Sequence, residues 1–348
     1  MAVDWSRGYS AQWRVMEVDP VTWADGASLP GARSASVERD WTSDAPTLES
    51  GGIDLDADPG EGFRERYVRL AMVASQGGER ERVDVATLLC SSTGGKVSRG
   101  NEALKVTGRS VLWPASKTLL ARGSYAPRGA DGAQLAGQML SSAIQAPVIV
   151  TGGFVLEQHV VYDMGSSVLA AAWLIVRAGN HRIRIDGRGR VYVEPVPSEP
   201  SLLLDRAHAR LLQPDVEREL DWSDVPNRYT SIDGTRVATA VNDDPLSVTS
   251  TAYRGWTHDV VDRSPIRVDG ETLDGYANRR LAELSVAEDS RTYKREWWPD
   301  VVPGDMVRGS IASVGIVGDL RVRRQSLACG NGIVVTERSA MEVRSWPI

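Results

Sequence analysis

Residues 166–197 place two hydrophobic periods side by side, and this change of period constrains the fold more than any other feature of the chain. The first half has the spacing of a buried helix, with Ser166 or Ser167 available as its N-cap. Gly179 and Asn180 follow, and both tolerate the left-handed conformation that ends a helix. The apolar residues of this helical run are Val168, Leu169, Ala172, Leu174, Ile175 and Val176.

The second half of this stretch alternates with a period of two, which is typical of a β-hairpin. Residues 186–189 (Asp-Gly-Arg-Gly) supply a turn with access to positive φ, and Pro195 and Pro197 end the second strand. The sequence therefore predicts a helix, a glycine stop and a hairpin, and none of these is a catalytic motif. Ile183, Ile185, Val191 and Val193 would share one face, and Arg182, Arg184, Arg190 and Tyr192 the other.

Both ends of the chain consist mostly of short alternating runs separated by Gly, Asp and Pro. Strands are predicted at 12–18, 21–23 and 34–41, with 64–73 pairing to 81–89, and later at 229–232, 237–241, 294–298, 311–317, 320–328 and 332–338. We therefore predict a mainly β fold with α+β insertions. It would have a first β-barrel-like domain at 1–125, an α+β domain at 126–200 and a second β-barrel-like domain with one helix at 201–348.

Two further helices can be placed from their caps. Asp131 is a candidate N-cap for a helix that Pro147 ends, and a short hairpin is expected after it from 148–150 and 154–161. Asp269 could cap a helix from 270 to about 287. A tight turn is predicted at 302–307, with Gly304 at its sharpest point.

The formal net charge of −6 gives the chain no overall electrostatic attraction to nucleic acid. The arginine-rich strands at 182–190 and 321–324 are expected to be solvated strand faces or salt-bridge partners between subunits. Cys90 and Cys329 are expected to be buried free thiols. The chain has no secretory signal and no apolar run of membrane-spanning length, so it is expected to be made in the cytoplasm.

Two passages resemble ligand-binding loops but depart from their patterns. Asp54, Asp56, Asp58 and Glu65 match charged positions of a calcium loop, whereas Pro59 replaces the required glycine, so an acidic surface turn is favoured. Residues 91–100 contain Gly-Gly-Lys but lack the first glycine and the Ser or Thr of a phosphate loop, and a flexible hairpin loop is favoured there.

No catalytic or metal-binding motif is found in the sequence. The four histidines, 159, 181, 208 and 258, lack zinc spacing, and HExxH, GxSxG and GxGxxG are missing. A pair of carboxylates for glycoside hydrolysis cannot be selected without geometry. We therefore assign no catalytic, cofactor-binding or metal-binding residue, expect no cofactor, and predict that the chain is not an enzyme.

Four passages, in this order, resemble the hub proteins at the distal end of phage tails. They are VMEVDPVTW near the N-terminus, SSVLAAAWLIVRAGNHRIRIDGRGRVYVEP, VPNRYTSIDG, where Asn227 opens a strand, and ETLDGYANRRLAEL followed by VVPGDMV. The likeness spans nearly the whole chain. It is to the baseplate hub family and to the N-terminal hub region of siphophage tail-associated proteins, which are minor tail proteins.

This resemblance implies a structural virion protein at the tail tip. Three copies would form a ring of two barrels each, closing the distal end of the tail tube around the channel for the tape-measure protein and DNA. The implied partners are further copies in a homotrimer, the distal tail or tail tube protein, the tape-measure protein, and a tail fibre or receptor-binding protein. DNA would pass without specific binding, and no membrane segment is involved.

Two other functions remain open from sequence. The chain could be a tail-associated cell-wall or glycan hydrolase, or a carbohydrate-binding tail adaptor in which Trp297 or Trp298 stacks on a sugar. Because the sequence ends at Ile348 without a fibre, peptidase or lysin extension, receptor binding and wall digestion are expected to belong to another protein.

Overall fold

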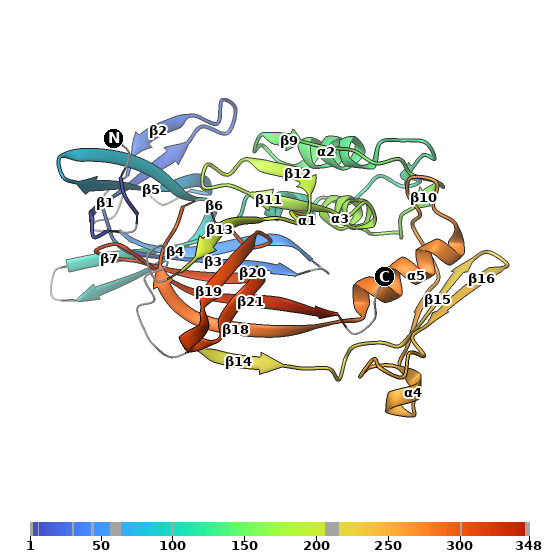
Figure 1. Cartoon of the computed structure of the whole chain (residues 1–348). Helices are drawn as coiled ribbons and strands as arrows, with labels where there is room; N and C mark the ends of the chain where they lie inside the picture. The colour runs from blue at the N-terminus through green and yellow to red at the C-terminus, as the bar shows by residue number, and fades with distance from the viewer. Residues whose placement is uncertain are drawn as a thin grey trace.

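The computed structural model describes residues 3–5, 7–29, 31–42, 45–55, 64–98, 101–205, 216–299 and 301–344. Most of the calcium-loop candidate, including Asp56, Asp58 and Pro59, lies outside these residues, as does His208. The described chain is mainly β, as the sequence predicts. It consists of one large sheet, three small sheets and five α-helices among the described residues (Figure 1).

Thirteen strands form the large sheet, and they come from both β-rich ends of the chain. They are β1 (Ser10–Val18), β2 (Asp25–Ser28), β3 (Ala32–Thr42), β4 (Ala45–Leu55), β5 (Arg66–Gln76), β6 (Glu79–Ser98), β7 (Asn101–Ser110), β13 (Pro200–Leu204), β14 (Glu217–Leu220), β18 (Val286–Glu296), β19 (Met306–Ile311), β20 (Ile316–Cys329) and β21 (Ile333–Arg344). The order along the main path is β14-β18-β21-β20-β3-β4-β7-β6-β5-β1-β2, with β19 joining β20 and β13 pairing with β19.

The prediction of two separate barrels is corrected by the pairing of β3 with β20. These strands run antiparallel from Asp40 opposite Arg324 to Ala35 opposite Cys329, so the first and last parts of the chain share one hydrogen-bonded sheet. The described strands do not close into barrels, because β2 and β14 each have one neighbour on this path. Alternating residues show which faces of single strands are buried, but they do not show which distant strands become neighbours.

Local strand predictions in the first part are largely confirmed. β1 and β3 occupy the expected segments, and β5 pairs with β6 through the turn at Gly77 and Gly78, which both have positive φ. Residues 91–98 are wrongly predicted as a loop, because β6 continues to Ser98 against β7. The run at 21–23 is a turn, and β4 was missed because its alternation is broken by Gly51 and Gly52.

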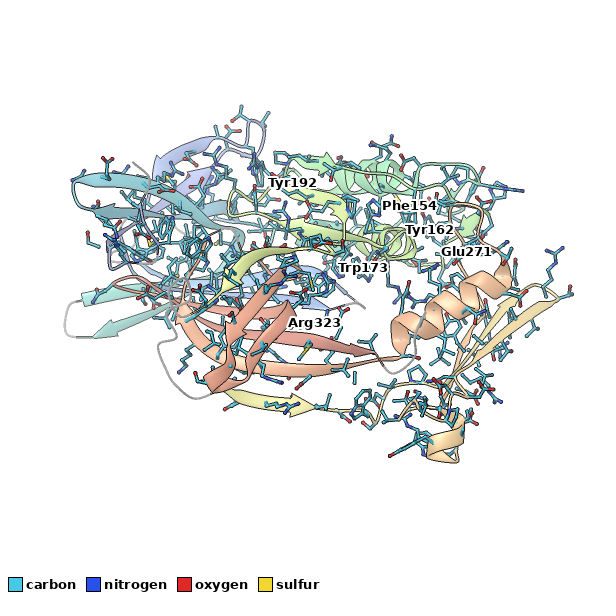
Figure 2. All side chains as sticks on the ribbon, in the orientation of Figure 1. Phe154, Tyr162, Trp173, Tyr192, Glu271 and Arg323 are labelled. Carbon is cyan, nitrogen blue, oxygen red and sulfur yellow. The ribbon has the colours of Figure 1, made fainter. Side chains whose placement is uncertain are left out.

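The middle of the chain forms an α+β unit against the large sheet. Its elements are α1 (Trp113–Lys117), β8 (Tyr125–Ala126), α2 (Gly132–Ala143), β9 (Val148–Val150), β10 (Val160–Val161), α3 (Val168–Ala178), β11 (His181–Ile185) and β12 (Val191–Pro195). Asp131 and Ser167 cap α2 and α3 as predicted, and the hairpin of β11 and β12 is confirmed. The helices pack on β11 and β12 around Leu140, Ile175 and Val193. Figure 2 labels Phe154 and Trp173 in this region.

The expected hairpin from 148–150 and 154–161 is wrong. β9 runs parallel to β12, whereas β10 pairs antiparallel with β8. Phe154 is buried among the helices instead, because Gly132 and Gly179 leave room for its ring. Because Phe154 and these two glycines are far apart in the sequence, no local pattern of residues predicts that they meet.

A small outlying unit lies at the end of the molecule away from β1 and β7 (Figure 1). It contains β15 (Arg228–Asp233), β16 (Arg236–Val241), α4 (Thr251–Arg254), β17 (Asp259–Asp262) and α5 (Leu273–Leu284). The sheet order is β16-β15-β17, and α5 packs on it through Tyr276, Ala277 and Leu281. Thr272, not Asp269, caps α5, and Asp269 takes a positive φ of 48° before the helix begins.

The last part has the predicted tight turn, in which Gly304 has a φ of 93°. The predicted strand at 294–298 is the end of the longer β18, since α5 ends at Leu284 and the chain becomes extended from Val286. A short 3-10 turn, η1 (Ala312–Val314), separates β19 from β20.

Candidate assembly surfaces

Several groups that could perform chemistry, including both cysteines, are enclosed in the fold. No group of three or more His, Cys, Asp or Glu side chains that could hold a metal ion occurs among the described residues. Cys90 and Cys329 are buried free thiols, as predicted, and burial raises the pKa of each to about 12. Such thiols stay protonated at neutral pH, which makes them poor nucleophiles.

The most deeply buried carboxylate belongs to an ion pair inside the large sheet. Glu337 and Arg295 are fully buried, and Glu337 also accepts hydrogen bonds from Tyr293 (2.7 Å) and Gln325 (2.9 Å). Burial alone would raise the pKa of Glu337, but the nearby Arg295 guanidinium holds it below its ordinary value. The Glu337 carboxylate has hydrogen-bond partners on the neighbouring side chains and no access to solvent. We therefore assign it a role in stabilising the fold.

The hairpin turn at 186–189 fixes the middle unit to the large sheet. Thr87 donates to the carbonyl oxygen of Gly187 (3.0 Å), and the indole of Trp23 donates to that of Arg188 (2.8 Å). The Arg69 guanidinium donates to the same Arg188 oxygen (3.0 Å). Trp23 is buried in the core that these two parts of the molecule share.

A second junction joins the other end of this hairpin to the turn at 302–305. Arg182 forms salt bridges with Glu194 (2.7 Å) and Asp305 (2.8 Å), and its side chain is only 4% exposed. Arg321 donates to the carbonyl oxygens of Pro197 and Gly304, both at 3.0 Å. The strands at 182–190 and 321–324 were predicted to be solvated faces or salt-bridge partners between subunits, but Arg182 and Arg321 are buried and bonded within one chain.

Trp41 lies next to this junction with two guanidinium groups over its ring. The guanidinium carbons of Arg321 and Arg323 lie 5.5 and 4.8 Å from the ring centre. Figure 2 shows Arg323 on the large sheet, beneath the middle unit. Burial lowers the pKa of Arg323, although Glu288 and Glu342 oppose the shift. The two junctions give the middle unit a fixed place on the sheet.

The outlying unit is organised around Asn227, which was predicted to open a strand. Its side chain is fully buried and donates to the carbonyl oxygens of Thr249 (3.1 Å) and Trp256 (3.0 Å). Its side-chain oxygen accepts from the backbone N–H of His258 (2.9 Å). One amide thus holds the loop of α4 against β15, immediately before that strand begins at Arg228.

The outlying unit is tied to the middle unit by the segment before α5. Asp269 accepts a hydrogen bond from the backbone N–H of Val155 (2.8 Å), and Glu157 accepts from that of Gly270 (2.7 Å). Glu271 follows at the start of α5 (Figure 2) and pairs with Arg279 at 2.7 Å. Asp269 therefore helps to connect two units, a role that its predicted place as a helix cap did not indicate.

Apolar side chains remain exposed on this outlying unit, as they do at other places on the described chain. They include Val237 (62%), Leu246 (89%), Tyr253 (65%), Trp256 (51%) and Val261 (51%). By contrast, Trp297 is 2% exposed and packs in the core, which removes it as a sugar-stacking residue. Large contiguous apolar patches mark sites of protein contact, whereas exposed apolar residues that are scattered singly are normal on a protein surface.

No family model matches the chain, and no curated protein matches it by sequence. Solved structures do match over nearly its whole length. The tail protein from Neisseria meningitidis MC58 has a TM-score of 0.66 at 14% identity, covering 96% of each chain. The chain has the fold of phage tail proteins.

Two further tail proteins support the same fold. The 43 kDa tail protein of prophage MuSo2 from Shewanella oneidensis has a TM-score of 0.62 at 12% identity, covering 96% of this chain and 98% of that one. Prophage tail protein gp18 from Listeria monocytogenes EGD-e has a TM-score of 0.53 at 9% identity, covering 94% of each. The resemblance to tail proteins found in the sequence is thus confirmed at the level of the fold.

Among the described residues, no helix of this tail-protein fold has the length and hydrophobicity needed to cross a bilayer.

Proposed function

We propose that this chain is a structural component of a phage-type tail and acts as the hub of the tail tip or baseplate. Three copies would form a ring that closes the distal end of the tail tube around a central channel. The supporting observation is the fold match to three tail proteins, which covers 94–98% of both chains in each comparison. Because each match covers nearly all of both chains, the likeness concerns the whole architecture and not a small shared motif.

The internal construction is suited to such a role. The two junctions of the middle unit use buried ion pairs and backbone hydrogen bonds, and the large sheet continues from one β-rich end to the other. A channel wall must keep its shape while other molecules pass through it. We retain 1–125, 126–200 and 201–348 as the proposed division into domains, with the first and last sharing the large sheet.

The proposed partners follow from this position in the tail. They are two further copies of the chain, the distal tail or tail tube protein, the tape-measure protein, and a fibre or receptor-binding protein. DNA would pass through the ring without specific binding. The protein would be located in the virion, and no cofactor or catalytic residue is proposed.

Deletion of the coding sequence from its parent phage or prophage genome tests this function. We expect particles without a complete tail tip, and restoration of normal tails when the chain is supplied from a plasmid, because a closed ring is needed before a tube can be built on it. Negative-stain images provide the measurement. Normal, infectious tails without the protein would contradict the proposal.

Purified protein offers a second and independent observation. A threefold ring with a central opening in negative-stain images, at the mass of three chains, is the expected result. A compact monomer that hydrolyses cell-wall glycan would instead favour the hydrolase alternative, and binding on a glycan array would favour the carbohydrate-binding adaptor.

A further inference from the structure

The outer strands of the large sheet and of the outlying sheet differ in how well they are protected against pairing with a further strand. The main path of the large sheet ends in β2 and β14, which have four residues each, and its side branch ends in β13, which begins with a proline, Pro200. Asp25 of β2 is ion-paired with Arg69 and Arg82, and three of the four residues of β14 are charged. Short, charged edge strands protect a sheet against further strands.

β16, at the edge of the outlying sheet, is longer and carries one charge, Arg236, at its first residue. It is six residues long, and no charge or proline lies between Arg236 and Asn242. Ala238 and Ala240 are buried against α5, whereas Val237 and Val241 are 62% and 38% exposed on the other face. Its neighbour on one side is β15, and no described strand pairs with it on the other.

The hydrogen-bond pattern shows which backbone groups face this open side. Asp233 lies opposite Arg236 across the turn, and the N–H of Asn242 donates to the carbonyl oxygen of Asn227 (2.8 Å). In an antiparallel pair the bonded residues alternate, so Ala238 and Ala240 also bond to β15. The N–H and C=O groups of Val237, Thr239 and Val241 therefore point outward, and no partner for them occurs in the described parts of the chain.

The sequence of this edge is a palindrome. Residues 237–241 read Val-Ala-Thr-Ala-Val in both directions, with Thr239 at the centre. A strand that pairs antiparallel with an identical strand about a two-fold axis meets its own sequence reversed. The palindrome therefore makes the edge complementary to itself in both side-chain size and face.

We propose that β16 pairs antiparallel with β16 of a second copy of this chain, about a two-fold axis at Thr239. Val237 would lie opposite the partner subunit's Val241, and Thr239 opposite the partner subunit's Thr239. The outward groups would form about six backbone hydrogen bonds, and each pair of valines would make an apolar contact on the exposed face. Arg236 would face the partner subunit's Asn242, so no like charges meet.

This pairing goes beyond the proposed tail function and does not depend on it. A two-fold contact between copies is not the contact that closes a threefold ring. It would join two free chains, or two rings, through their outlying units. Failure of the pairing would leave the hub proposal untouched, and failure of the hub proposal would leave the pairing untouched.

Cysteine cross-linking of the full chain tests the proposed register. In Thr239→Cys the two new residues would have Cα atoms about 5.5 Å apart, which is within disulfide range. Val261→Cys is the matched control, because Val261 is exposed on the same face but would lie about 24 Å from its copy, five strand spacings away. Cys90 and Cys329 are buried and do not compete. We expect disulfide-linked dimers under mild oxidation for Thr239→Cys, and their loss for Val261→Cys.

Thr239→Pro gives a second readout. It removes the outward N–H of Thr239, which β15 does not use, and proline is tolerated at such an edge position. We expect sedimentation of the natural chain to show pairs, either of single chains or of rings, and we expect this pairing to be lost in the variant, with an unchanged melting temperature of the single chain. Equal cross-linking at 239 and 261, or no association by the natural chain through this edge, would overturn the proposal.

Discussion

At the scale of single residues, neighbouring glycines in this chain are needed for different reasons. In the turn at 186–189 the sequence predicts positive φ, and Gly189 has a φ of 73°. Gly187 is required for a different reason, because a Cβ there would overlap the carbonyl group of Asp84. Likewise Asn180, not Gly179, takes the left-handed conformation after α3, and Gly179 makes room for Phe154. Turn conformation could be predicted locally, whereas close approach depends on distant residues.

Gly187→Ala should therefore destabilise the chain. Overpacking of a close contact typically costs about 1–3 kcal/mol, and here the neighbouring atom is rigid backbone in β6. We expect a lower midpoint of thermal unfolding, measured by circular dichroism. Gly330→Ala is the control, because a Cβ at Gly330 meets nothing within 4 Å. Equal midpoints for the two variants would show that the turn does not press on β6.

At the scale of elements, predictions succeeded where the determining residues are close in sequence. α2, α3 and the hairpin of β11 and β12 each have their caps or turn residues within a few positions, and all three were predicted. The parallel pairing of β9 with β12 was not predicted, because β9 has three residues and its partner lies about forty positions later. The free edge of β16 was also missed, although its strand was placed correctly, since exposure depends on packing in the whole unit.

The edge strand β14 provides an element-scale prediction that depends on pH. Hydrogen bonds from Arg291 and from Arg218 of β14 lower the pKa of Asp289 to about 2. The folded pKa lies below the unfolded value, so the stabilisation is complete above about pH 4 and is lost as the pH falls towards 2. Asp289→Asn should cost about 2 kcal/mol at pH 7, as expected for hydrogen bonds to a charged group, and this cost should shrink below pH 4.

Urea unfolding at a series of pH values would measure the difference between the natural chain and Asp289→Asn. Asp319→Asn is the control, since its Arg308 pair also crosses two strands but both side chains are largely exposed. Exposed pairs contribute little to stability. A cost at Asp289 that stays constant down to pH 2 would refute the assignment.

For the whole molecule, composition and alternation predicted a mainly β chain with α+β insertions, and the order of four passages indicated a tail-protein fold. They did not predict one shared sheet in place of two barrels, because the pairing of β3 with β20 joins segments near opposite ends of the chain. The outlying unit likewise has its own small core, centred on Tyr229, Tyr276 and Leu281. Its separation from the larger cores depends on packing that no single segment determines.

This small core should open more readily than the rest. Local opening costs less free energy where few apolar residues are buried. We therefore expect backbone amides of β15 and α5 to exchange with deuterium faster than those of β5 and the first half of β6, which lie in a much larger core. Hydrogen–deuterium exchange with mass spectrometry would measure this. Uniform protection across these four elements would show that the molecule opens only as a whole.

The contact between β3 and β20 also has a consequence for synthesis. Ser326 of β20 donates a hydrogen bond to Glu38 of β3 across 288 positions. The edge of β3 that pairs with β20 therefore stays open until the ribosome has made nearly the entire chain. At about 5–20 residues per second, that wait is roughly 15–60 s. During this interval a nascent strand with a buried apolar face is open to neighbouring nascent chains on the same messenger. Expression at lower translation density, or with a chaperone that holds nascent strands, should therefore raise the yield of correctly folded protein.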